Sequence, residues 1–173
     1  MSDGSSAPSP KLAQEAPQQA GEDEATALML MRVAGRWFTI DAHMVQEVAV
    51  KGAVTRVPTA PRHVLGIVGL RGGLVPVVSL EQMLAGIGPS TSDAATTLPR
   101  LVVVRAGEYE IGLVVDEIRG IIHASPPAHA PETRKPGHPS FLCGEFEWQG
   151  NLVCRLDVPR LVAAAVERGQ GGD

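Results

Sequence analysis

The chain has 173 residues, of which 44% are hydrophobic but only 3% aromatic, and its formal net charge is -4 at pH 7. This length suits one domain or two small ones, with a core built from Val, Leu, Ile, Ala and Met. Since no run of five Lys or Arg residues occurs, the sequence argues against nucleic acid or an anionic membrane surface as the main partner.

Cysteine content and apolar run length indicate the compartment. Cys143 and Cys154 are too few for a disulfide framework, and no secretory apolar segment opens the chain. The longest apolar runs, such as LVVV at 101–104, fall far short of the roughly 20 residues that span a bilayer. We therefore expect a soluble, cytoplasmic protein.

The two ends of the chain differ from its middle. Residues 1–25 are dominated by Ser, Pro, Ala, Gln and acidic residues, which cannot bury enough surface to offset the entropy of ordering. We expect a disordered N-terminal tail over 1–25, a single domain over 26–166 and a frayed C-terminus over 167–173.

The middle of the chain reads mainly as strands. LMLMRVAGRWFTI (28–40) and RLVVVRAGEYEIGLVV (100–115) each predict two strands joined by a short turn, at Ala34-Gly35 and at Ala106-Gly107. VLGIVGLRGGLVPVVSL (64–80) mixes β-branched residues with four glycines and a proline. GEFEWQGNLVCRLDV (144–158) repeats its pattern at a constant offset, with Gly66, Gly72 and Leu74 matching Gly144, Gly150 and Leu152.

A short helix follows each of these matched segments. Ser79 and Gln82 have capping-box spacing, while Asp157 is a good N-cap ahead of Pro159, and Gly169 is a plausible stop. The chain thus contains one unit twice, made of a hairpin, a linker, a glycine-punctuated hairpin and a helix.

Glycines in such hairpins allow a small sheet to curl sharply. We expect Gly72-Gly73 to form a tight turn with positive φ angles, and Pro76 to lie at an edge or a bulge. Each repeat has about five strands, enough to close a small barrel of its own. The segment 123–140 carries five prolines and predicts an irregular, exposed loop.

Four segments in order carry a family resemblance. They are VQEV (45–48), the stretch from RVP to VVSL (56–80), IGLVVDEI (111–118), and FLCG followed by GNLVCRLDVPRLV (141–162). Together they resemble the CheW family of bacterial chemotaxis coupling proteins. The resemblance implies a mainly β fold of two side-by-side five-stranded SH3-like β-barrels with short helices.

The resemblance also implies a function. It is that of a non-enzymatic adaptor that links the tips of methyl-accepting chemotaxis receptors to the regulatory domain of a CheA-type histidine kinase. The chain departs from the family where Gly69 replaces the Asn of its NLRG motif and where Arg155 replaces an aliphatic residue. These departures leave open an alternative, a CheW-like paralogue that serves a pilus or surface-motility pathway with altered partner preference.

The resemblance selects the candidate binding residues. Arg71 lies near a hairpin tip, where its guanidinium can chelate a carboxylate or cap backbone carbonyls. The family places the segment around 45–48 near the groove that takes the receptor's helical hairpin, and we take 115–118 as its counterpart in the second repeat. The predicted receptor- or kinase-binding residues are Val45, Glu47, Val48, Leu70, Arg71, Val115, Asp116 and Ile118.

Catalytic and metal-binding alternatives find little support in the sequence. The two cysteines are eleven residues apart, unlike the close pairs of zinc sites, and three of the five histidines fall in the Pro-rich loop. GLRGG (69–73) runs into LVPVV and not into a helix, so it lacks the anion site of a phosphate loop. We expect no cofactor, no metal and no enzymatic reaction, although a small-molecule-binding or enzymatic SH3-like protein stays the alternative from another class.

Overall fold

A computed structural model describes residues 25–85, 99–125 and 138–170 of the chain. Nearly all of the predicted tail and most of the predicted Pro-rich loop therefore lie outside the described residues. The described elements are β1 (Thr26–Val33), β2 (Arg36–Asp41), the 3-10 helix η1 (Ala42–Met44), β3 (Val45–Val50), β4 (Val64–Leu70), β5 (Gly73–Ser79), α1 (Leu80–Met83), β6 (Arg100–Ala106), β7 (Tyr109–Val115), β8 (Glu117–Ala124), β9 (Leu142–Trp148), β10 (Asn151–Leu156) and α2 (Val158–Gln170).

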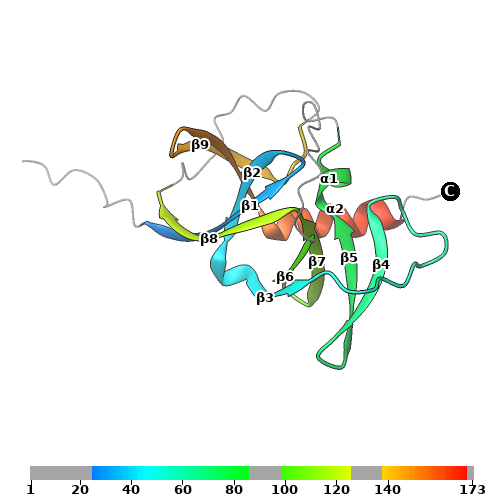
Figure 1. The fold of residues 1–173 in the computed structure, drawn as a ribbon. Coiled ribbons are helices and arrows are strands. Elements are labelled where there is room, and N and C mark those ends of the chain that lie inside the picture. Colours follow the sequence, from blue (N-terminus) through cyan, green and yellow to red (C-terminus); the bar gives the residue numbers. More distant parts are fainter. Residues whose placement is uncertain (1–24, 86–98, 126–137, 171–173) are drawn as a thin grey trace, which may run out of the picture.

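The strands form two five-stranded sheets that lie side by side (Figure 1). The first sheet has the order β8-β1-β2-β10-β9 and the second the order β3-β6-β7-β5-β4. The mainly β fold with two five-stranded units is thereby confirmed. Exchanging each strand for its counterpart in the other repeat converts one order into the other, so the two sheets are related by the predicted duplication.

The assignment of strands to sheets corrects our expectation that each repeat closes its own barrel. Each sheet combines the first hairpin of one repeat with the last three strands of the other. Among the described residues, no ladder joins the outer strands of either sheet, so hydrogen bonding does not close them into barrels. The prediction missed this exchange because a hydrophobic pattern specifies which face of a strand is buried, but not the strand beside it.

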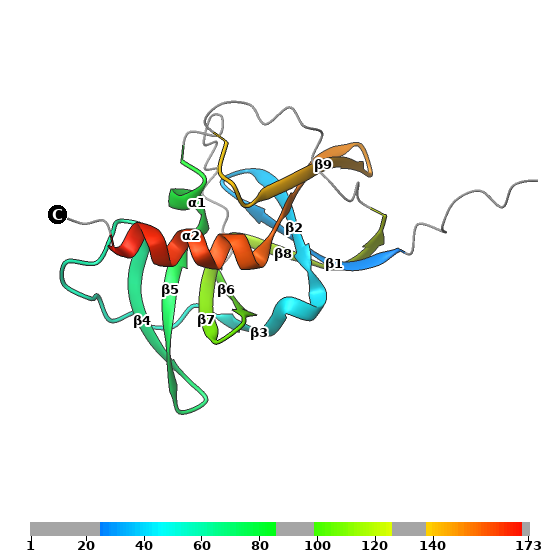
Figure 2. The same ribbon diagram turned by 180° about the vertical axis from the view of Figure 1, so that it is seen from behind.

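One apolar core runs between the two sheets. It contains buried side chains from the first sheet, from the second sheet and from α2, which lies across the strands of the second sheet (Figure 2). Phe38 and Phe141 are its largest fully buried side chains. A second, smaller apolar cluster consists only of residues from the second sheet, namely Val68, Val75, Val77, Leu101 and Val103.

The duplication extends to the bulges that bend the strands. Each bulge is one residue that has no partner on the neighbouring strand. These residues are Gln46 on β3 and its equivalent Arg119 on β8, and Leu65 on β4 and its equivalent Cys143 on β9. Bulges at equivalent positions give both sheets the same curl. The expected use of glycine next to such bends is seen at Gly66, whose φ is +145°.

The tight turns differ from the prediction by one residue in two places. The β4–β5 turn is Arg71-Gly72, with φ angles of 49° and 79°, and Gly73 already belongs to β5. The β6–β7 turn is Gly107-Glu108 and not Ala106-Gly107, because Ala106 pairs with Tyr109 at the end of the ladder. The Ala34-Gly35 turn is confirmed, with both residues at positive φ.

Pro76 is not at an edge or a bulge, since β5 lies between β7 and β4. On β4, Pro76 is paired with Ile67. The backbone N–H and C=O of Ile67 both form hydrogen bonds with Thr55, at 2.9 Å each. The ladder with β7 begins only at Val77. Pro76 is tolerated inside the sheet because neither neighbour needs the N–H that proline lacks.

Both predicted N-caps are confirmed. The Gln82 N–H donates to Ser79 Oγ at 3.3 Å, and the Arg160 N–H donates to Asp157 Oδ1 at 2.9 Å. Pro159 is the second residue of α2 rather than the first. Gly169 does not end α2, which continues to Gln170 and so carries regular structure past the expected boundary at 166.

The close approach at Gly66 generates a stability prediction. Any Cβ added there would overlap the carbonyl oxygen of Thr55, and the positive φ is unfavourable for an L side chain. We expect Gly66→Ala to lower the free energy of unfolding by about 2 kcal/mol or more, measured by urea denaturation. Gly69→Ala, on the same strand but with open space around it, is the control and should change stability by less than about 0.5 kcal/mol. Equal losses in the two variants would contradict this explanation.

Candidate functional site

The predicted binding residues fall in two regions of the structure. The chain passes from one sheet to the other at 41–45 and at 115–118, which we call the crossovers, and these hold Val45, Val115, Asp116 and Ile118. Glu47 and Val48 follow on β3, an outer strand of the second sheet. Leu70 and Arg71 lie at the β4–β5 turn, on the opposite side of the same sheet.

Asp116 fastens the second crossover to the first sheet. Its carboxylate Oδ2 accepts a hydrogen bond of 2.7 Å from the Ala34 N–H, and its own N–H donates to the Arg32 carbonyl at 2.9 Å. Ala34 is in the left-handed region at φ 49° within the β1–β2 turn. Asp116 therefore holds this turn against the crossover, a role within the fold that the sequence did not indicate.

The apolar crossover residues differ in accessibility. Val115 is fully buried in the core shared by the two sheets, so its side chain does not reach the surface. Val45 and Ile118 are half-buried and pack against the same core. Met44, directly before Val45, lines an apolar pocket of about 510 Å³ together with Ala106, Tyr109 and residues of α2.

Arg71 and Glu47 form an ion pair that joins the two sides of the second sheet. Arg71 Nε lies 2.9 Å from Glu47 Oε2, with side-chain exposures of 73% and 24%. Glu47 comes from β3 and Arg71 from the β4–β5 turn, which follows the opposite outer strand. The structure thus brings together two residues selected separately from the sequence. Most of the Arg71 side chain still faces solvent, where it can contact a partner.

Four of the seven exposed large apolar side chains in the described residues form two equivalent pairs, which the sequence reasoning did not use. Leu74 and Leu152, each just after a hairpin turn, are 73% and 61% exposed. Val48 and Ile121, each two residues after a bulge, are 44% and 50% exposed. The signal for the first pair was present in the matching of Leu74 with Leu152. Val48 corresponds to Ile121 in the structure, so the counterpart of the segment 45–48 is 118–121 and not 115–118.

The described residues hold no group of three or more His, Cys, Asp or Glu side chains arranged to bind a metal ion. Burial raises the pKa of the Cys154 thiol to about 11 and also raises the pKa of Cys143, in spite of nearby arginines. Both thiols are therefore protonated at neutral pH and poor nucleophiles. None of the helices in the described part of the chain is long and apolar enough to cross a membrane.

The exposure of the ion pair predicts how little it contributes to stability. Because Arg71 is largely exposed, water screens the pair, and its contribution to stability should stay below about 1 kcal/mol. We expect Arg71→Ala and Glu47→Ala each to shift the urea midpoint only slightly. A loss of more than about 2 kcal/mol in either variant would mean that the pair is needed to hold the second sheet together.

The thiol environments predict slow chemical modification. At pH 8 a thiol with a pKa near 11 is almost entirely protonated, so Ellman's reagent should react with native Cys154 far more slowly than with the urea-unfolded chain. Half-buried Cys143 should react before buried Cys154. Rapid reaction of both thiols in the native protein would contradict the burial and the raised pKa values.

Three comparisons bear on this architecture. The family model of the CheW-like domain matches residues 27–166. The chain is 32% identical over 122 residues to the chemotaxis protein CheW of Thermotoga maritima, covering 70% of this chain and 78% of that protein. It is 26% identical over 133 residues to CheW of Rhizobium meliloti, covering 76% and 83%.

A partial sequence match and a structural match agree with the match to the CheW-like family model. The chain is 33% identical over 94 residues to protein FrzA of Myxococcus xanthus, covering 52% of this chain and 54% of that protein. The crystal structure of the scaffolding protein TtCheW from Thermoanaerobacter tengcongensis superposes with a TM-score of 0.63 at 20% identity, covering 77% and 89%, and shows the same fold. The family model spans nearly all of the described sheets and helices, and this chain therefore belongs to the CheW-like family.

Proposed function

We propose that this protein is a non-catalytic adaptor that couples the signalling tips of chemoreceptors to a CheA-type histidine kinase. It would act in the cytoplasm and reach membrane receptor arrays only through its partners. Membership of the CheW-like family supports the class of function. The observation that carries the proposal further is the pairing of exposed apolar side chains at equivalent positions of the two repeats.

The hairpin leucines are the proposed kinase contacts. Leu74 and Leu152 each protrude beside a tight turn, and burying such a side chain in a partner is worth about 2 kcal/mol. Because the protein carries the same feature on both sheets, it can offer two contacts of one kind. Contacts of moderate strength then suffice in an array, since neighbouring contacts raise the effective concentration of one another.

The proposed receptor contact is the region around the crossovers and β3. Val48 is exposed, Val45 and Ile118 are half-buried, and the apolar pocket beside Met44 adds aliphatic surface. An amphipathic helix docks on such a surface through apolar anchors spaced one turn apart. The exposed part of Arg71 and the carboxylate of Glu47 would supply polar contacts near this surface. Buried Val115 and Asp116, which is tied to Ala34, would support the surface from within.

Signalling would then be a shift in the conformational equilibrium of the kinase. An adaptor that binds two kinase conformations with different affinity changes their populations by that difference in affinity and needs no chemistry of its own.

Reconstitution tests the proposal. The purified protein is mixed with a CheA-type kinase and a receptor signalling fragment, and co-purification and kinase autophosphorylation are measured. We expect Leu74→Asp or Leu152→Asp to weaken kinase binding by about tenfold or more, because a carboxylate replaces a side chain that would be buried. Val48→Asp should weaken binding of the receptor fragment instead.

Ile121→Asp is the matched control for the kinase arm, since it places the same charge at an exposed apolar position outside the hairpin turns. Circular dichroism and urea denaturation must first show that each variant is folded. Unchanged kinase binding in both leucine variants would overturn the proposed contact. Unchanged kinase activity on addition of the wild-type protein to the kinase and receptor fragment would overturn the coupling role itself.

A further inference from the structure

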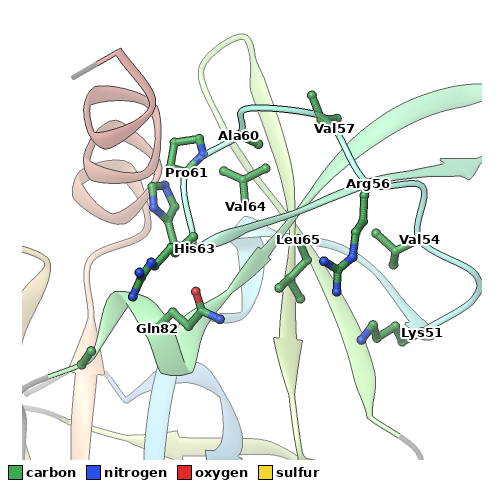
Figure 3. Close-up of a pocket in the computed structure, with 12 residues that line it drawn as sticks. Lys51, Val54, Arg56, Val57, Ala60, Pro61, His63, Val64, Leu65 and Gln82 are labelled. Atoms are coloured by element: carbon green, nitrogen blue, oxygen red, sulfur yellow. The ribbon is translucent and has the colours of Figure 1, made fainter. Parts of the chain in front are cut away.

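A pocket of about 740 Å³ opens beside the second sheet, away from the crossovers. Its walls are the connection from β3 to β4 (51–63), the start of β4 and the short helix α1 (Figure 3). The proposed coupling contacts do not involve it, although part of its lining, from Arg56 to Leu65, belongs to the matched stretch 56–80.

Cations line the pocket, and the described part of the chain places no carboxylate beside them. They are Lys51, Arg56 and Arg62, and no described Asp or Glu lines the pocket. Elsewhere in the described residues, six arginines have a carboxylate oxygen within 4 Å, namely Arg32, Arg71, Arg105, Arg119, Arg155 and Arg160. None of the described carboxylates forms such a pair with the three pocket cations. In a chain of net charge -4, three positive charges thus gather in one recess with no described carboxylate within ion-pair distance.

Hydrogen bonds hold the pocket wall in place. His63 is buried, with its Nε2 3.0 Å from the Ala165 carbonyl of α2, and its own carbonyl accepts from the Ser79 N–H at 2.8 Å. Thr55 exchanges two backbone hydrogen bonds of 2.9 Å with Ile67, and the Lys51 N–H donates to the Pro99 carbonyl at 3.1 Å. The cations therefore project from a connection that is tied to both the sheet and α2, which lowers the entropic cost of binding.

The charges lie at two ends of the pocket. Lys51 and Arg56 lie together at one end, while His63 and Gln82 mark the other, with Leu65 between them (Figure 3). Arg62 directly precedes His63 in the chain and lines the pocket as well. Two cationic ends with an aliphatic stretch between them fit an extended ligand whose acidic groups flank an apolar one. A single phosphate group favours donors that converge on one point.

Other anionic ligands fit less well. The lining contains no aromatic side chain on which a nucleic acid base could stack. An anionic membrane surface attracts clusters of about four to eight basic residues, whereas three described cations line this pocket. We propose that the pocket binds an acidic segment of a protein partner, in which carboxylates on either side of an apolar residue meet Lys51 and Arg56 at one end and Arg62 at the other.

This inference does not depend on the coupling role, and it is tested on the full chain alone. The ¹⁵N-labelled protein is titrated with acetyl-Glu-Glu-Leu-Glu-Glu-amide and, separately, with the same peptide carrying Gln in place of each Glu, and amide chemical shifts are followed. We expect the Glu peptide to shift the signals of residues 51–65 and Gln82 in a saturable manner that weakens with added salt. The Gln peptide should cause no saturable change.

Matched double variants locate the site. Arg56→Gln with Arg62→Gln should weaken binding of the Glu peptide by about tenfold. Arg119→Gln with Arg160→Gln removes the same charge at two exposed positions outside the pocket and should change affinity less than twofold. The dispersion of the amide spectrum shows whether each variant is folded. If the pocket variant is unfolded, the comparison of the Glu and Gln peptides on the wild-type protein tests the proposal instead.

Three outcomes would overturn the proposal. Equal binding of the Gln peptide would show that charge is irrelevant. Inorganic phosphate that shifts the same signals as tightly as the Glu peptide would reveal a site for small anions only. Equal weakening in the pocket and control variants, or shifts outside 51–65 and α1, would mean that the peptide responds to overall charge and not to this pocket.

Discussion

The apolar core shared by the two sheets is the constraint on which the rest of the structure depends. Each repeat contributes its first hairpin to one sheet and its remaining strands to the other, so neither repeat contains a complete sheet. The largest cluster of buried side chains draws on both sheets and on α2. Because protein interiors are close-packed, a change in one sheet is felt in the other. The two sheets are therefore parts of one packed core and not two independent domains.

Strand exchange also determines where the surface features lie. The chain must cross twice between the sheets, and backbone groups near these crossovers need hydrogen-bond partners. Asp116, in the second crossover, supplies one by accepting the N–H of Ala34 in the β1–β2 turn. The bulges recur at equivalent positions, and so do the exposed apolar side chains that follow them or follow the hairpin turns. A duplicated fold thus presents duplicated contacts without any reactive group, and this is the physical basis of the proposed adaptor role.

The distribution of charge adds a second kind of surface. Most described arginines are satisfied by a carboxylate nearby, as in the half-buried pair of Arg155 Nη2 and Asp41 Oδ1 at 2.8 Å. Arg155, which departs from the aliphatic residue usual in the family, is thus accommodated in a central strand by a charged partner on β2. The cations of the pocket beside α1 form no such pair with a described carboxylate, and on this contrast rests the proposal that they attract the acidic groups of another molecule.

The sequence by itself determined the eight strands of the four hairpins, three of the turn glycines, both helix N-caps and the duplication, because these depend on local conformational preference and on spacing along the chain. It did not place β3 and β8, which follow the first hairpin of each repeat. It also determined the family through short motifs such as the one around Arg71. Only the tertiary structure decided which strands share a sheet, since backbone hydrogen bonds are alike for every strand and carry no sequence label. For the same reason the pairing of Arg71 with Glu47, the burial of Val115 and the gathering of Lys51, Arg56 and Arg62 around one recess could not be predicted. The ion pair and the burial of Val115 depend on segments distant in sequence that the exchange of strands brings together, and the recess depends on how the connection 51–63 folds beside α1.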